Sequence, residues 1–257
     1  MERWLQLHVW TKDQQQDQDQ EGRLLDEKIP INKAWVDFLQ MSPFLKRKLV
    51  TLLETVAKLR TSTVVYPGEE RVFSWSWLCE PTQVKVIILG QDPYHGGQAT
   101  GLAFSVSKTD PVPPSLRNIF LEVSACDSQF AVPLHGCLNN WARQGVLLLN
   151  TILTVEKGKP GSHSDLGWIW FTNYIISCLS NQLDHCVFML WGSKAIEKAT
   201  LINTNKHLVL KSQHPSPLAA RSNRPSLWPK FLGCGHFKQA NEYLELHGKC
   251  PVDWNLD

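Results

Sequence analysis

Four short runs of apolar residues divide the chain, and each is followed directly by small or polar residues. The runs are Val84–Leu89, Gly145–Leu149, Cys186–Trp191 and His207–Leu210. Continuous apolar runs of this length are typical of strands that are buried on both faces of a parallel sheet. The sequence therefore predicts a central four-stranded parallel sheet.

Helical patterns occupy the intervals between these runs. Apolar residues recur at helical spacing from Ile31, then from Pro43 to Leu59, and again around Trp168, in a helix that Ser162 or Ser164 is expected to begin. Further helices are predicted at Phe73–Leu78, at Leu116–Ser124 with Ser115 as its cap, at Cys137–Arg143, after Ser193 and at His236–His247. Strands that alternate with helices predict an α/β fold in which helices flank both faces of the sheet.

The domain organisation follows from length and composition. Residues 11–22 are polar and of low complexity, so a flexible N-terminal segment is expected over 1–22. The remainder, 23–257, is the right size for a single domain with a substantial core. A hydrophobic content of 43% and 11 Trp residues argue against wholesale disorder, and no apolar run approaches the roughly 18 residues that cross a bilayer.

Cysteine usage and charge narrow the class of protein further. The seven cysteines form no C-x-x-C pair, which favours free thiols in a cytosolic or nuclear protein over disulfides or zinc. The net charge is only +2, but residues 201–241 contain no Asp or Glu. The basic residues of this segment are Lys206, Lys211, Arg221, Arg224, Lys230 and Lys238. Such a segment is either a phosphate-facing surface or an ordinary solvated face.

Residues capable of chemistry follow the strands. Gly90-Gln91-Asp92-Pro93-Tyr94-His95 follows the first strand, Asn150 the second, Gly192-Ser193 the third, and His214 the fourth. Because the carboxyl ends of parallel strands meet at one edge of a sheet, these side chains are expected to surround one ligand. Each residue alone has a plain structural explanation, as a turn cap or as packing, but together they indicate a site.

The residue types suggest a planar polar ligand. The Asn150 amide donates and accepts side by side, as a base edge requires. Asp92 is suited to orienting water or stabilising a developing cation, and His214 to holding a developing anion. Tyr94 and Phe104 are candidates for the walls of the pocket, with Phe104 stacked on the ligand.

Three turns and one apolar residue indicate a nucleic-acid partner. Pro113-Pro114-Ser115, Gly192-Ser193 and Ser216 place hydroxyl and backbone N–H groups near helix starts, where successive phosphates would bind. Leu218 lies between prolines and a basic loop with no obvious core to join. Proteins that unstack DNA insert apolar residues of this kind.

These motifs together resemble family 1 uracil-DNA glycosylases. Gly90–His95, Leu147–Asn150 and His214–Leu218 are similar to the water-activating, uracil-recognition and leucine-loop motifs of that family, in the correct order within residues 31–247. The likeness is strongest to the gammaherpesvirus form, because Ala219–Lys230 enlarges the leucine loop. Where cellular members carry Arg-Gly before Phe-Phe-Gly-Cys, this chain has Pro229-Lys230, so Arg221, Arg224 or Lys230 is expected to replace that arginine.

The resemblance implies a DNA repair hydrolase that flips uracil out of DNA and cleaves its N-glycosidic bond, leaving an abasic site, with no metal or organic cofactor. It implies Asp92 and His214 as catalytic residues and Gln91, Tyr94, Phe104 and Asn150 as uracil-binding residues. The DNA-binding residues that it implies are Pro113, Pro114, Ser115, Gly192, Ser193, Ser216, Leu218, Arg221, Arg224 and Lys230.

The expected partner is uracil-containing DNA, single- or double-stranded. The resemblance further implies a monomer in the host nucleus, no membrane association, a viral DNA polymerase or processivity factor as partner, and inhibition by a DNA-mimicking protein. An alternative function is a DNA-binding accessory protein of viral replication whose excision activity is secondary. A zinc-dependent base deaminase is disfavoured, because the chain has no Pro-Cys-x-x-Cys element.

Overall fold

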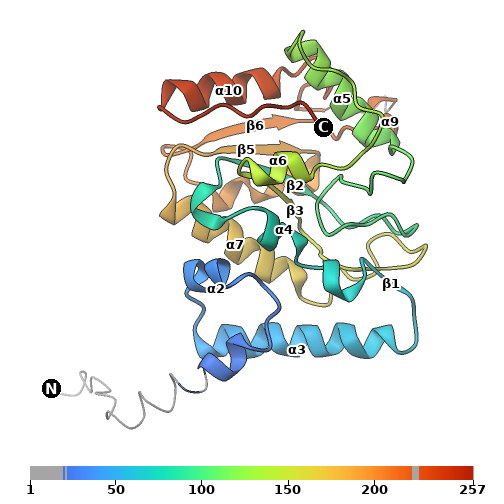
Figure 1. The fold of residues 1–257 in the computed structure, drawn as a ribbon, viewed down its shortest axis with the longest axis vertical. Helices are drawn as coiled ribbons and strands as arrows, with labels where there is room; N and C mark the ends of the chain where they lie inside the picture. Colours follow the sequence, from blue (N-terminus) through green and yellow to red (C-terminus); the bar gives the residue numbers. More distant parts are fainter. Residues whose placement is uncertain (1–19, 21, 222–225, 257) are drawn as a thin grey trace, which may run out of the picture.

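A computed structural model describes residues 20, 22–221 and 226–256 (Figure 1). The predicted flexible segment 1–22 lies outside the described residues except for residues 20 and 22. The division into that segment and a domain over 23–257 therefore stays a prediction.

The central sheet has four parallel strands, as the sequence predicts. They are β2 (Val86–Gly90), β3 (Val146–Asn150), β5 (Val187–Trp191) and β6 (Leu208–Ser212), in the order β3-β2-β5-β6. Each strand begins one or two residues later than its apolar run, and β2, β3 and β6 also end one or two residues later, because their ladders continue into the first small or polar residues; β5 ends with its run at Trp191. The register pairs Gly90 with Asn150 and Trp191 with Ser212, so the carboxyl ends of the strands lie at one edge.

Helices flank both faces of this sheet (Figure 1). They are α2 (Lys33–Leu39), α3 (Pro43–Arg60), α4 (Ser74–Leu78), α5 (Pro114–Cys126), α6 (Asn139–Arg143), α7 (Trp168–Gln182), α8 (Ser193–Ile196), α9 (Pro217–Ala220) and α10 (His236–Leu246). Short 3-10 helices lie at η1 (Glu69–Arg71), η2 (Pro81–Gln83) and η3 (Glu197–Leu201), and β1 (Val65–Tyr66) pairs antiparallel with β4 (Val155–Glu156). Every residue of β2, β3 and β5 is buried, so the core is built around the sheet.

Aromatic side chains tie these layers together. The Trp141 ring of α6 packs edge-on against Phe120 of α5, with ring centroids 6.4 Å apart, and contacts Phe237 of α10 at 6.1 Å. Trp191, at the end of β5, contacts Phe237 at 5.9 Å and Phe231 at 5.0 Å. Aromatic contacts of this kind contribute to the stability of packed layers, and those of Trp191 lie at the carboxyl end of β5.

Two predicted helix starts are wrong. Helix α5 has Pro113 as its N-cap and Pro114 as its first residue, so Ser115 lies inside the first turn rather than at the cap. Helix α7 begins at Trp168 after Gly167, not at Ser162 or Ser164. The serine hydroxyl at 162 instead accepts a hydrogen bond from the Glu156 N–H, which keeps that segment in a turn. Helix α9 and the β1–β4 pair were not predicted, since elements of two to four residues carry no periodicity.

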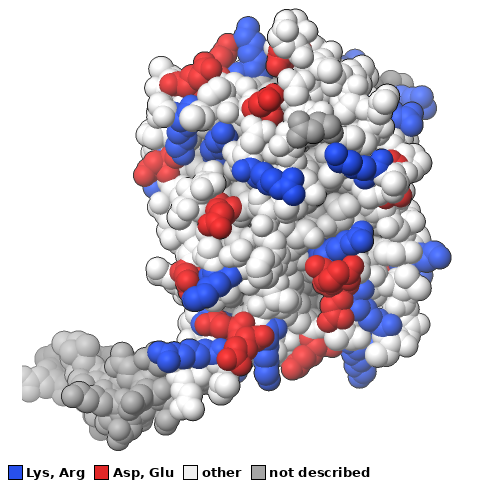
Figure 2. Space-filling view, in the orientation of Figure 1, with Lys and Arg blue, Asp and Glu red and all other residues white. Residues whose placement is uncertain are grey.

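The basic segment 201–241 is only partly available to a ligand. Lys206 pairs with Asp184 at 3.0 Å, and Lys238 lies 3.8 Å from Glu242. The Lys211 ammonium lies 5.1 Å above the Trp228 ring. Lys and Arg are interspersed with Asp and Glu over the face shown in Figure 2. Lys206, Lys211 and Lys238 thus have partners within the protein, whereas Arg221 and Lys230 are exposed to solvent.

Two further observations concern the part of the chain that the structure describes. No helix there is both long enough and apolar enough to cross a membrane. All seven cysteines are free thiols, as the sequence predicts.

Buried His236 is expected to make stability depend on pH. Its Nδ1 accepts a hydrogen bond from Trp191 Nε1 at 3.0 Å, and burial lowers its pKa to about 4. An unfolded chain binds this proton near pH 6.5, so the unfolded state binds more protons between the two values. The stability that neutral His236 contributes is therefore complete above pH 6.5. As the pH falls from 6.5 towards 4, the free energy of unfolding decreases by up to about 1.4 kcal/mol per pH unit.

The variant His236→Asn offers the test, because Asn Oδ1 also accepts from Trp191 but does not titrate. Urea unfolding between pH 7 and pH 4.5 should show a shallower loss of unfolding free energy in the variant. Equal slopes for the two proteins would contradict the assignment.

Candidate active site

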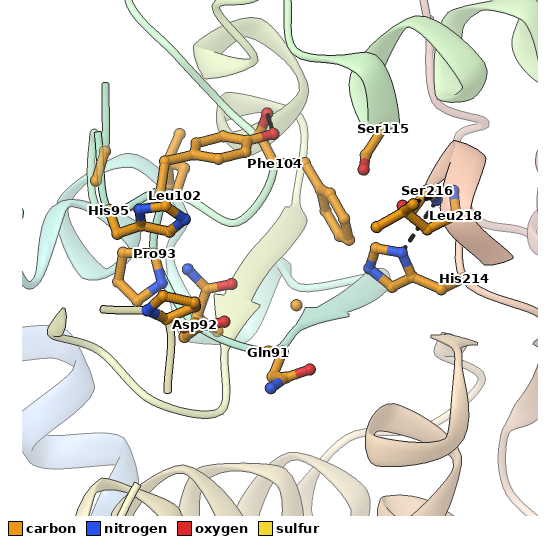
Figure 3. A pocket seen from close by; sticks show the side chains of 16 residues that line it. Gln91, Asp92, Pro93, His95, Leu102, Phe104, Ser115, His214, Ser216 and Leu218 are labelled. Carbon is orange, nitrogen blue, oxygen red and sulfur yellow. Dashed lines mark hydrogen bonds between the residues drawn. The ribbon is translucent and has the colours of Figure 1, made fainter. Parts of the chain in front are cut away.

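A cavity of about 410 Å³ opens at the carboxyl edge of the sheet. Figure 3 shows Asp92 and His95 on one side of it, His214, Ser216 and Leu218 on the other, and Phe104 between them. The segments after β2, β3 and β6 all contribute, together with the first turn of α5 and the turn into α9. Of the predicted residues, those that line this cavity are Gln91, Asp92, Tyr94, His95, Phe104, Ser115, Asn150, His214, Ser216 and Leu218.

Asn150 occupies the inner part of the cavity because Gly90 has no side chain. A Cβ at Gly90 would lie 2.0 Å from the Asn150 Oδ1 atom. The Asn150 side chain is only 7% exposed and makes no hydrogen bond with the described residues, and it lines the cavity. A buried amide of this kind is ready to pair with a ligand that presents a donor and an acceptor together.

The Asp92 carboxylate is oriented by a loop distant in sequence. Its Oδ2 accepts a hydrogen bond of 2.7 Å from the backbone N–H of Gly161. The neighbouring Pro160 also lines the cavity, so the 157–166 turn forms part of its wall. Asp92 is only partly buried, which leaves room for water beside the carboxylate.

Phe104 projects into the cavity from a strained backbone. Its φ of +63° is unusual for a bulky residue. Hydrogen bonds on either side hold it there: Ala103 N–H donates to Leu148 O, and the Tyr94 hydroxyl donates to the Phe104 carbonyl at 3.2 Å. Burial raises the pKa of Tyr94, so the hydroxyl keeps its proton. The Phe104 ring lies 5.9 Å from His214 and is available as a stacking surface.

His214 faces the cavity as a neutral imidazole. Its Nδ1 accepts a hydrogen bond of 3.0 Å from the Ser216 N–H, so the ring proton lies on Nε2. Burial lowers the pKa of His214, which keeps the ring uncharged at neutral pH. Gly192 packs against it: a Cβ there would lie 3.1 Å from His214 Cβ, at a φ of +86° that favours glycine.

The remaining predicted residues lie around the opening of the cavity, here called the mouth. Gly192 and Ser193 border a smaller adjoining hollow of about 120 Å³, together with Gln91 and His214. Leu218 is 80% exposed on the first turn of α9, whose N-cap is Ser216. Pro113 and Pro114 begin α5, beside the mouth. Arg221 and Lys230 are exposed, and Arg224 lies outside the described residues.

Sequence reasoning missed three residues that support the site. Gly161 orients Asp92, Trp191 packs against Phe104 at 5.6 Å, and the Asn118 amide donates to the Pro215 carbonyl at 2.7 Å. The Gly158-Lys159-Pro160-Gly161 run signals a turn, but nothing local indicates which residue it meets. Among the residues that the structure describes, no cluster of three or more His, Cys, Asp or Glu is placed to hold a metal ion.

Comparison with known proteins identifies the family. The model of the Uracil DNA glycosylase superfamily matches residues 77–245. A uracil-DNA glycosylase of Equine herpesvirus 2 (strain 86/87) is 97% identical over 257 residues, which is 100% of both chains. One from Epstein-Barr virus (strain B95-8) is 55% identical and covers 98% of this chain and 97% of that one. A solved mimivirus UNG variant in complex with UGI has a TM-score of 0.77 at 31% identity, covering 90% of this chain and 91% of that one.

The family match covers more than half of the chain, and the herpesvirus relatives match over essentially its whole length. The predicted likeness to gammaherpesvirus enzymes is confirmed. The chain belongs to the uracil-DNA glycosylase family, whose members hydrolyse the bond between uracil and DNA.

Proposed function

We propose that the cavity receives a uracil base rotated out of DNA, and that Asp92 and His214 cleave its N-glycosidic bond. The observation that carries the proposal is the convergence of a free Asn150 amide, an oriented Asp92 carboxylate and a neutral His214 in one cavity. An enzyme that acts on a base within a duplex must extrude that base, at a cost of roughly a few kcal/mol.

Recognition of the base is assigned to four residues. Asn150 would accept from uracil N3–H and donate to O4, while Phe104 stacks on the ring. Tyr94 fills the space beside C5, so the methyl group of thymine would collide with it. Gln91 is exposed, which is consistent with contact through its backbone.

The chemistry is a hydrolysis. The bond from the sugar C1′ to N1 of uracil breaks, and its electron pair leaves with the base. Asp92 stabilises the positive character on the sugar and positions the water whose oxygen bonds to C1′, as carboxylates do in glycoside hydrolysis. The Nε2–H of His214 donates to uracil O2 as negative charge develops there, which favours the transition state over the bound substrate.

Binding of the DNA strand is assigned to the mouth. Ser115, Ser193 and Ser216 would contact successive phosphates. Leu218 is exposed and apolar, so it is suited to filling the space that the base vacates. Arg221, Arg224 and Lys230 are proposed to supply the positive charge.

Timed release of uracil from matched single- and double-stranded oligonucleotides tests the proposal and gives the strand preference. Release from both, with Leu218→Ala impaired more strongly on duplex, is expected. Binding without release would instead favour the accessory role in viral replication, in which a polymerase or processivity factor is the partner.

The variant Asn150→Asp is expected to lose uracil release and gain some release of cytosine. A carboxylate can only accept while ionised, whereas cytosine presents a donor at the position of uracil O4. Oligonucleotides with one uracil or one cytosine at the same position measure both activities. Unchanged uracil release would contradict the role of Asn150. Asn205→Asp provides a control for the chemical change, because Asn205 is exposed in the turn before β6.

The wider setting is also proposed from the family. The mimivirus UNG variant binds UGI, and we propose that a DNA-mimicking inhibitor of this kind binds the mouth of this enzyme as well. Since the substrate is DNA and the relatives are herpesvirus proteins, the host nucleus is the proposed location.

A further inference from the structure

One face of α5 carries a stripe of polar residues that points at the segment containing Leu218. The stripe consists of Ser115, Asn118, Glu122 and Cys126, whose spacing of three and four residues places them on one side of the helix. Ser115 lines the cavity, whereas the other three lie farther along the helix. In Figure 1, α5 lies beside α9 and α10, and contacts between these helices agree with that view.

Asn118 holds the beginning of the 215–235 segment. Its Nδ2 donates to the carbonyl oxygen of Pro215 at 2.7 Å. Pro215 lies between His214 and Ser216, and the Ser216 N–H is the donor to His214 Nδ1. A shift of the Pro215 peptide would therefore move the imidazole and the start of α9 together.

Glu122 holds the end of the same segment. Its side chain is buried, at 2% exposure, and its two oxygens accept from Gly233 N–H at 2.5 Å and Gly235 N–H at 2.7 Å. The thiols of Cys126 and Cys234 both lie 3.7 Å from Oε1. Burial raises the pKa of both thiols, that of Cys234 to about 12, so both remain protonated donors.

The end of the segment leads back to the cavity. Phe231, two residues before Gly233, packs on Trp191 at 5.0 Å, and Trp191 packs on Phe104 at 5.6 Å. One helix thus connects to the His214 ring through Asn118 and to the Phe104 ring through Glu122. A buried carboxylate is costly unless it is fully hydrogen-bonded. Among the described residues, the donors bonded to Glu122 belong to α5 or to the turn at 233–235.

We propose that Asn118 and Glu122 are positioning residues for uracil excision. Asn118 holds the Pro215 peptide so that His214 and Leu218 meet the extruded nucleotide correctly, and Glu122 holds the turn at 231–235 that packs through Trp191 against Phe104. The inference rests on the roles proposed above for His214 and Leu218. Misplacement of a catalytic group by about 1 Å can cost up to about 100-fold in rate, even when the altered residue is remote from the reaction.

The experiment uses the full chain, a duplex with one uracil, and single-turnover rates with KM and Tm. Asn118→Ala is expected to lower kcat about 10- to 100-fold with a smaller change in KM. Tyr174→Phe is the matched control, since it removes a 2.7 Å hydrogen bond to the Leu39 carbonyl far from the cavity. It should lower Tm comparably while leaving kcat unchanged.

Double-mutant cycles separate positioning from general destabilisation. In a His214→Leu background, Asn118→Ala should cost less than about twofold, because its effect acts through His214. Glu122→Gln replaces one acceptor oxygen by an N–H₂ group and should lower kcat, with a smaller effect in a Phe104→Ala background, because its effect acts through Phe104. If Asn118→Ala does not fold, Asn118→Asp is the second variant. It has the same size but places a carboxylate oxygen against the Pro215 carbonyl oxygen, and a comparable loss of kcat is expected.

Two results would overturn the inference. One is wild-type kcat in folded Asn118 and Glu122 variants; the other is an Asn118→Ala effect that is fully additive with His214→Leu together with a Glu122→Gln effect that is fully additive with Phe104→Ala. Failure of the proposed function is distinguishable. In that case the wild-type protein releases no uracil, or His214→Leu is as active as wild type, whatever the Asn118 variants do.

Discussion

Replacing Asp92 by Asn is expected to lower the rate of uracil release about 10³-fold, while binding of uracil-containing duplex is retained. The amide has nearly the same shape, and one of its atoms can still face the Gly161 N–H. It carries no negative charge, however, so it neither stabilises a cationic sugar nor polarises the water. Single-turnover release and a binding titration on the same oligonucleotide measure the two properties separately.

The control for Asp92→Asn is Asp37→Asn on α2. That carboxylate is 62% exposed and pairs with Lys33, one turn away, so its removal should leave the rate unchanged. If Asp92→Asn released uracil at the wild-type rate, the carboxylate would have no part in bond cleavage. Weakened binding with an unchanged rate would instead make Asp92 a ligand for the substrate.

Replacing His214 by Leu is expected to lower kcat by about 10² to 10³, with a smaller effect on KM. The lost Nε2–H donor interacts most strongly once charge has developed on the departing base, so the transition state loses more than the ground state. Single-turnover rates over a range of substrate concentrations separate the two constants.

The pH dependence offers an independent check of the same residue. Burial lowers the pKa of His214 below its usual 6.5, and protonation of Nδ1 would also break the hydrogen bond from Ser216. Activity that requires neutral His214 should therefore persist below pH 6.5 and fall only at lower pH. If activity were instead lost as the pH falls through a value above 6.5, His214 would not act as a neutral donor.

The variant His185→Asn controls for the loss of an imidazole. His185 lies at the amino end of β5, on the opposite edge of the sheet, where it stacks on His247. Its φ of +52° is one that Asn tolerates better than most residues, so the fold should be retained. Its rate and pH profile are expected to match those of the wild-type enzyme.

Much of the fold could be predicted because its signals are local. The apolar runs before Gly90, Asn150 and Gly192 each identify a fully buried strand without reference to any other part of the chain. The run before His214 also identifies a strand, but the expectation of full burial is wrong there, because β6 is the edge strand and three of its five residues are only half-buried. The parallel orientation of the strands then follows from the helices that connect them. Helix starts were less predictable, since the Ser162 hydroxyl bonds within a turn and Pro113 takes the cap position ahead of Ser115.

The candidate site was predictable in its residue types but not in its supports. Asp92, Asn150 and His214 stand out because polar residues follow directly on apolar strands. Nothing near Asp92 in sequence indicates that Gly161 will orient it, and nothing near Pro215 indicates Asn118. These contacts join residues 69 and 97 positions apart, and they exist only once the sheet has brought the segments together.

By itself, then, the sequence determined which segments become strands, which chemical groups follow them, and the family to which the chain belongs. Only the tertiary structure decided the orientation and the protonation of those groups. Gly90 is required because Asn150, from the next strand, occupies the space of its Cβ. His214 is neutral because the fold buries it and directs the Ser216 N–H at its Nδ1. Burial and hydrogen-bond partners set protonation and orientation, and both depend on residues that meet only in the folded chain.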